Sequence, residues 1–248
     1  MTISPDQWVI WQGYGIALNA TILFTWAVMA LLVLGALLVT ARLDDSETIS
    51  PWQNMLEVIV TAIRDQIAGI GAEEPETYLP FVGTLFLFIA ASNLLMIVPG
   101  YAPPTGSLST TAALALCVLV AVPVYGIRRR GLGRYLRGYA RPTLLMLPFN
   151  ILGEISRTIA LAIRLYGNVM SGTVIAGVLI GIAPFVFPVV MQLLGLITGF
   201  VQAYIFAILA MVYIASATRA HIGGGDDTGR GTPPSPERTE NDPWTHQT

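Results

Sequence analysis

Charged residues are nearly absent from five long stretches of the chain, and this pattern predicts five membrane-spanning helices. A helix needs about 20 mostly apolar residues to cross a hydrocarbon core of about 30 Å. Flanking side chains can complete a shorter span by reaching the interface. The pattern predicts an all-α integral membrane protein, whose spans lie at 16–41, 79–98, 112–127, 144–182 and 184–217.

The last two stretches are too long to stand upright in a bilayer. At about 1.5 Å per residue, 144–182 would extend for roughly 58 Å and 184–217 for roughly 51 Å. Hydropathy alone leaves two alternatives open. The helices are broken, or they are long and steeply tilted, beyond the usual range of tilt.

Between the first two spans, apolar residues recur at helical spacing beside charged ones, namely Leu56, Ile59, Val60, Ile63 and Ile67. We interpret them as an amphipathic helix at the membrane interface. Residues 222–248 are polar and rich in Gly and Pro, which is typical of a disordered tail. The predicted organisation is an outer segment 1–15, a membrane domain 16–221 and a cytoplasmic tail 222–248.

The basic residues set the orientation. All 13 are arginines. If the first span runs from outside to inside, eleven of them lie inside and none outside, at positions 42, 64, 128, 129, 130, 134, 137, 141, 219, 230 and 238. Cytoplasmic loops carry an excess of basic residues, so we expect an outer N-terminus and a cytoplasmic C-terminus.

Composition excludes several classes of function. The chain is 54% hydrophobic and 11% charged, whereas soluble domains carry roughly a quarter charged residues. A net charge of −2 gives no reason to expect a nucleic-acid partner. Cys117 is the single cysteine and both histidines lie outside the spans, so we expect no metal or cofactor site. No glycine-rich phosphate loop is present, so the chain has no nucleotide site of its own.

Two arginines lie inside the fourth predicted span, where a charge is costly and guanidinium does not lose its proton. On a helix, Arg157 and Arg164 share one face with Asn168 and Ser171. Glu154 is the only acid of the last two spans, and we interpret it as the ion-pair partner of Arg157 at i and i+3. Arg164 lies roughly 15 Å further along the axis, so it must face water or a partner subunit.

The final span carries small residues at helical spacing, namely Gly195, Gly199, Ala203, Ala207 and Ala210. Small residues let a second helix approach closely. We expect that helix to be the preceding long one, packed antiparallel. The Cα atoms of Arg164 and Gln202 should then lie within about 12 Å of each other. Gln202 alone is as consistent with glue between helices as with a functional site.

Two long segments resemble a known family. EISRTIALAIRLYGNVMSG is similar to the signature helix of subunit a of F-type ATP synthases, and FVQAYIFAILAMVYIASA is similar to its final helix. SNLLMIVPGYAPPTGSLSTTAALAL is similar to the hairpin of that family. The resemblance covers roughly residues 51–217. It implies that the two long helices form a steeply tilted hairpin around a ring of c subunits.

The resemblance places the essential arginine at Arg164, with Asn168 and Gln202 as its companions in ion translocation. It implies a supporting polar pathway of Glu154, Arg157, Ser171, Thr173 and Tyr213. Two positions depart from the family. Thr173 and Gly195 stand where well-known members place an access-channel acid and a histidine, which indicates a divergent branch and leaves the ion, H⁺ or Na⁺, open.

The implied function is that of a stator subunit in a bacterial inner membrane. It would provide two half-channels, and ion flow through them would drive ATP synthesis. The implied partners are the c-ring, b-type stator subunits, the soluble ATPase head and the lipid bilayer. An alternative from the residues alone is a secondary transporter that binds an anionic substrate at Arg164. The sequence leaves ring size and working direction open.

Overall fold

The computed structural model describes residues 9–13, 16–40, 51–70, 74–98, 100–133, 135, 146–182 and 187–219. Its long helices are α1 (Ala20–Thr40), α2 (Pro51–Gly69), α3 (Pro75–Leu94), α4 (Leu108–Arg130), α6 (Met146–Ile182) and α7 (Phe187–Arg219). Within these described residues, five helices are long and apolar enough to cross a membrane, all except α2. The predicted five-crossing helical fold is confirmed. The predicted tail 222–248 lies outside the described residues.

The N-terminal end differs from the prediction. The first span was expected from residue 16, but Ile16–Asn19 is strand β2, which pairs antiparallel with β1 (Val9–Gly13), and α1 begins only at Ala20. Hydropathy does not separate an apolar strand from the start of an apolar helix. The sequence does carry a local signal for this strand pair, because Gly13 and Gly15 separate two β-prone runs, a pattern that is typical of a hairpin.

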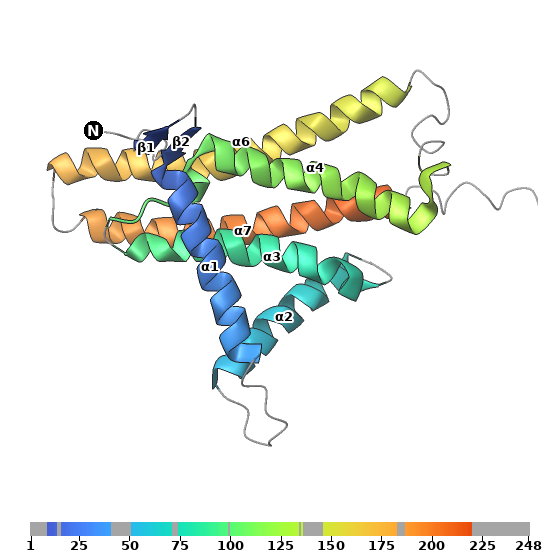
Figure 1. The fold of residues 1–248 in the computed structure, drawn as a ribbon, viewed down its shortest axis with the longest axis horizontal. Helices are drawn as coiled ribbons and strands as arrows, with labels where there is room; N and C mark the ends of the chain where they lie inside the picture. Colours follow the sequence, from blue (N-terminus) through green and yellow to red (C-terminus); the bar gives the residue numbers. More distant parts are fainter. Residues whose placement is uncertain are drawn as a thin grey trace, which may run out of the picture.

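Both long helices are unbroken over the described residues, which decides between the two alternatives left by hydropathy. α6 runs for 37 residues and α7 for 33. Figure 1 shows α1 lying crosswise to α3, α4, α6 and α7, which run alongside one another. A helix α1 that crosses the bilayer directly would therefore leave α6 and α7 steeply inclined.

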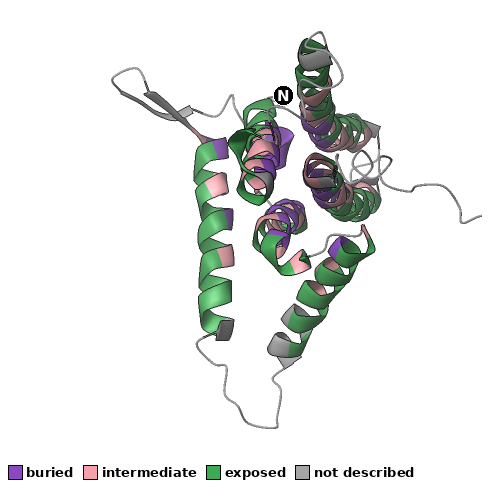
Figure 2. Ribbon diagram, turned by 90° about the vertical axis from the view of Figure 1, so that its right-hand side faces the viewer, coloured by how far each residue is buried: buried purple, intermediate pink, exposed green. Residues whose placement is uncertain are grey.

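The core lies where these four helices meet, and α7 contributes most to it. Its residues Ala203, Phe206, Ala210 and Ile214 are fully buried. Figure 2 shows that the buried faces of the four helices turn toward one another, whereas α1 is almost wholly exposed. Such exposed apolar faces are expected of helices that lie in lipid or against partner subunits.

Helix α2 has the predicted amphipathic character. Ile67 is buried, and Ile59 and Ile63 pack against the core cluster. On its exposed side, Arg64 donates a hydrogen bond to Glu76 of α3 at 2.7 Å. The pair is exposed and therefore contributes little to stability.

Candidate functional site

Helices α6 and α7 form an antiparallel hairpin whose register is given by two side-chain contacts. Asn168 Nδ2 donates to the Thr198 carbonyl oxygen at 3.3 Å. Eleven residues earlier on α6, Arg157 lies with its guanidinium carbon 5.6 Å from the centre of the Tyr213 ring. Arg164 lies between Arg157 and Asn168 on α6, so these two contacts fix its position along the hairpin.

Arg164 lies one helical turn before Asn168, and Gln202 lies one turn after Thr198. Because the helices run antiparallel, both steps lead to the same level of the hairpin. The sequence prediction that Arg164 and Gln202 share a level is thus consistent with the contacts. The expected separation of about 12 Å between their Cα atoms stays a prediction.

Arg164 points away from the body of the subunit. Its side chain is exposed, whereas Leu161 and Leu165 on the neighbouring face of α6 are buried. Among the described residues, Arg164 has no hydrogen bond or ion pair, and the single ion pair found there joins Arg64 to Glu76. A permanent cation in an apolar helix requires water or an acid from outside the described residues.

Gln202, in contrast to Arg164, is buried. Its side chain is 6% exposed, and its Nε2 has no hydrogen-bond partner among the described residues. A buried amide without a partner is unfavourable, so it marks a place where water or another polar group is expected. The hairpin therefore carries an outward-facing cation and an inward-facing amide at one level.

The predicted ion pair between Glu154 and Arg157 does not form within the described chain. Arg157 instead lies over Tyr213 of α7, and the face of an aromatic ring attracts a cation. The i and i+3 spacing allowed the pair, but a helix surface offers a long arginine other partners across the hairpin. Glu154 is half-buried, and its carbonyl accepts a hydrogen bond from Thr158.

Ser171 and Thr173 lie beyond Asn168 toward the end of α6, and both are exposed. The Ser171 hydroxyl donates to the carbonyl of Asn168, and the Thr173 hydroxyl donates to that of Val169. Each hydroxyl is thus satisfied within its own helix. The structure does not bring them to the side chain of Arg164.

The small residues of α7 serve a different neighbour from the one expected. A Cβ added to Gly199 would lie 2.8 Å from Cβ and Cγ of Asn93, which belongs to α3. A Cβ at Gly195 would meet nothing within 4 Å in the described structure. Gly199 therefore permits close approach of α3, and the expectation that these glycines serve α6 is wrong.

Sequence reasoning missed a set of buried polar residues on the Asn168 side of the site. It comprises Ser92, Asn93, Thr105, Ser107 and Thr111, all at most 2% exposed, and we call it the α3–α4 polar set. They come from the end of α3, the connection and the first turn of α4. The available signal was Asn93 within an apolar span and the run of hydroxyl residues that follows.

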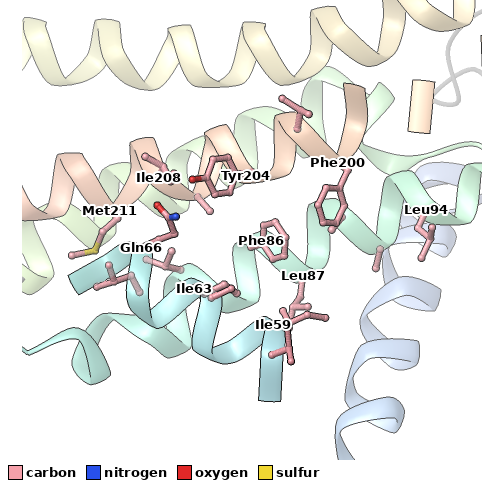
Figure 3. A pocket seen from close by; sticks show the side chains of 18 of the residues that line it. Ile59, Ile63, Gln66, Phe86, Leu87, Leu94, Phe200, Tyr204, Ile208 and Met211 are labelled. Atoms are coloured by element: carbon pink, nitrogen blue, oxygen red, sulfur yellow. The ribbon is translucent and has the colours of Figure 1, made fainter. Parts of the chain in front are cut away.

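An apolar cavity of about 830 Å³ lies on another side of the molecule. Its walls come from α2, α3 and α7, with Leu32 of α1 at one side. Figure 3 shows lining residues such as Ile63, Phe86 and Met211. No residue of α6 lines it. Apolar walls cannot hold an ion, so this cavity is separate from the site at Arg164.

Comparison with known proteins identifies the family of the chain. A sequence model of the family described as ATP synthase A chain matches residues 22–215. "ATP synthase subunit a" of Albidiferax ferrireducens is 59% identical over 88% of this chain and 95% of its own length. "ATP synthase subunit a" of Nitrosospira multiformis is 57% identical over 92% of both chains. "ATP synthase subunit a 1" of Chlorobaculum parvum is 60% identical over 88% of this chain and 97% of its own. The chain therefore belongs to the ATP synthase A chain family.

Proposed function

We propose that this multi-pass membrane protein is the ion-translocating stator subunit of a rotary ATP synthase, and that Arg164 faces the carboxylates of a c-ring. The observation that carries the proposal is the exposed guanidinium of Arg164, which has no acid partner among the described residues. The family of this chain supports a place for it among the subunits of an ATP synthase. The c-ring, b-type stator subunits and soluble head are the expected partners.

The chemistry follows from the fixed charge. A ring carboxylate cannot cross lipid in its charged form, so it travels protonated or ion-occupied. Near a guanidinium the charged form is favoured, so the pKa of the carboxylate falls and it releases its ion. The fixed positive charge also repels a free cation, which prevents direct passage between the two sides. Each charge moved supplies about 2.3 kcal/mol per 100 mV of potential.

Two polar clusters flank Arg164 and are the candidate half-channels. With the α3–α4 connection outside, the α3–α4 polar set lies on the outer side of Arg164, and Gln202 lies at the level of Arg164. Glu154, Arg157 and Tyr213 lie on the inner side, roughly 10 Å or more along α6 from Arg164. Neither cluster of side chains supplies an acid and a histidine together. Neutral polar groups and water would therefore conduct H⁺ or Na⁺ on the outer side.

Transport of an anion by this chain alone is the weaker alternative. Such transporters commonly bind their substrate between the ends of broken helices near the midplane. Here α6 and α7 are continuous through the level of Arg164. No described feature of the structure favours a substrate pocket at that arginine.

Cross-linking tests the proposed contact with the ring. Ala160 lies one turn from Arg164 on the exposed face of α6, and Leu116 is 56% exposed on α4. In whole complexes with Cys117 replaced by Ser, Ala160→Cys should form a disulfide with a cysteine placed beside the ring carboxylate. Leu116→Cys should not. A disulfide requires Cα atoms within about 7 Å, so equal yields from both positions, or none from Ala160→Cys, would overturn the proposed orientation.

A further inference from the structure

Asn93 connects three segments that are distant in the sequence. Its side chain is 2% exposed near the end of α3. Its amide nitrogen donates to the carbonyl of Ile89 at 2.9 Å and to the carbonyl of Gly199 at 3.2 Å. Its amide oxygen accepts from the hydroxyl of Thr105 at 3.2 Å. Both amide hydrogens are therefore used, one of them across to α7.

Two consecutive carbonyls of α7 each receive a side-chain amide, one from each neighbouring helix. Thr198 is bound by Asn168 of α6, and Gly199 is bound by Asn93 of α3. In an α-helix these carbonyls also accept the backbone N–H groups of the residues four positions later. For Thr198 that residue is Gln202. The turn of α7 that ends at Gln202 is thus held from both sides.

Close packing reinforces the contact between Asn93 and α7. The absent Cβ of Gly199 would lie 2.8 Å from Asn93 Cβ, an atom attached directly to the backbone of α3. One residue further, Phe200 packs edge-on against Phe86 of α3, with ring centres 5.6 Å apart. Any larger residue at position 199 must therefore move one helix away from the other.

We propose that Asn93 is a positioning residue for ion transfer, because with Asn168 it sets the height and rotation of the α7 turn that carries Gln202 beside Arg164. This inference rests on the proposed function of Arg164 and adds a residue of α3 to it. Asn93 has this positioning role in addition to its place in the α3–α4 polar set. It acts through the carbonyl of Gly199.

Two variants in the whole complex test this role. Asn93→Leu removes the amide at similar size, and Gly199→Ala keeps the amide but pushes α3 and α7 apart. Both should lower ATP-driven pumping per ATP hydrolysed by at least about tenfold, since displacements near 1 Å at a reacting site can cost this much.

Gly83→Ala is the matched control for Gly199→Ala. Gly83 is also a buried helical glycine, but a Cβ there would meet nothing within 4 Å. Both changes favour the helix equally through backbone entropy. A loss of pumping in Gly199→Ala but not in Gly83→Ala would come from the contact with Asn93.

The pH profile of pumping distinguishes displacement of the site from poor assembly. A guanidinium that is displaced lowers the pKa of the ring carboxylate less, so the carboxylate releases its proton only at higher pH. The profiles of Asn93→Leu and Gly199→Ala should therefore shift to alkaline pH. An assembly defect would lower pumping equally at every pH.

Each outcome decides the matter. Reduced pumping with an alkaline shift in both variants supports the inference. Normal pumping, or a reduction without any shift, overturns it. If the cross-link from Ala160→Cys to the ring forms in wild-type background while these variants keep the normal profile, the inference about Asn93 fails and the proposed function stands. If that cross-link is absent, the proposed function itself fails.

Discussion

Replacing Gln202 by leucine should make the subunit more stable and less functional. The Gln202 side chain is 6% exposed, and its Nε2 has no partner among the described residues. A buried polar group without a hydrogen bond costs about 1–3 kcal/mol. Leucine fills a similar volume without that cost. We therefore expect Gln202→Leu to raise the free energy of unfolding by about 1–3 kcal/mol while it weakens coupling between ATP hydrolysis and pumping.

Asn93 provides the matched comparison, because it is a second buried amide of the same bundle with all its donors in use. Asn93→Leu leaves the Thr105 hydroxyl without its acceptor and should lower the free energy of unfolding by about 1–3 kcal/mol. The same kind of substitution should thus raise the free energy of unfolding at Gln202 and lower it at Asn93. The difference comes from hydrogen bonding alone.

The assay heats purified complexes and measures how much of the subunit stays in the membrane sector. For a chain of this size, 1 kcal/mol corresponds to roughly 2–4 °C in the midpoint. Gln202→Leu should therefore raise the midpoint above the wild-type value, and Asn93→Leu should lower it. Pumping is measured on the same preparations. A midpoint that falls in Gln202→Leu as it does in Asn93→Leu would show that the Gln202 amide is satisfied, and would refute the reasoning.

Two further predictions concern orientation and the inner cluster. With Cys117 replaced by Ser, an impermeant thiol reagent should label Val98→Cys from outside and Gly133→Cys only from inside, because the positive-inside rule predicts a cytoplasmic place for the arginine-rich segment after α4. Both positions are exposed, whereas Ser107 is fully buried. The reverse labelling would refute the topology. Tyr213→Phe should pump normally and Tyr213→Leu should pump less. The reason is that Arg157 contacts the ring, and a cation over an aromatic face gains about 0.5–2 kcal/mol. Equal pumping by the two variants would show that the Tyr213 ring has no part in the pathway.

The sequence was sufficient for the membrane architecture because the bilayer constrains it so strongly. A helix in lipid must be long and apolar, so the uncharged stretches coincide with helices, and charges such as Arg157 and Arg164 stand out. The length of the last two stretches left broken helices and long tilted helices both open, and only the resemblance to the subunit a family implied the long, tilted form. Helix ends were less predictable, because Ile16–Asn19 is mostly apolar and continuous with the helix that follows, and yet it forms a strand.

The site was only partly predictable, because hydropathy says nothing about which helix lies beside which. Gly199 was recognised as a close-packing residue, but its partner is Asn93 of α3 and not a residue of α6. Likewise the spacing of Glu154 and Arg157 allowed an ion pair, while the guanidinium lies 5.6 Å from the ring centre of Tyr213, which is distant in sequence. Long-range contacts of this kind depend on tertiary packing, which one sequence does not encode in any local pattern.

Ion pumping by Arg164 variants tests the central claim most directly. Whole complexes in sealed vesicles are supplied with ATP, and ion uptake and ATP hydrolysis are measured together. The variants are Arg164→Ala and Arg164→Lys, and the control is Arg128→Ala, which removes an exposed arginine at the end of α4. Both Arg164 variants should abolish pumping while the detached soluble head still hydrolyses ATP, since a compact ammonium lacks the planar, weakly hydrated guanidinium. Arg128→Ala should pump normally. Normal pumping by Arg164→Ala would contradict the account.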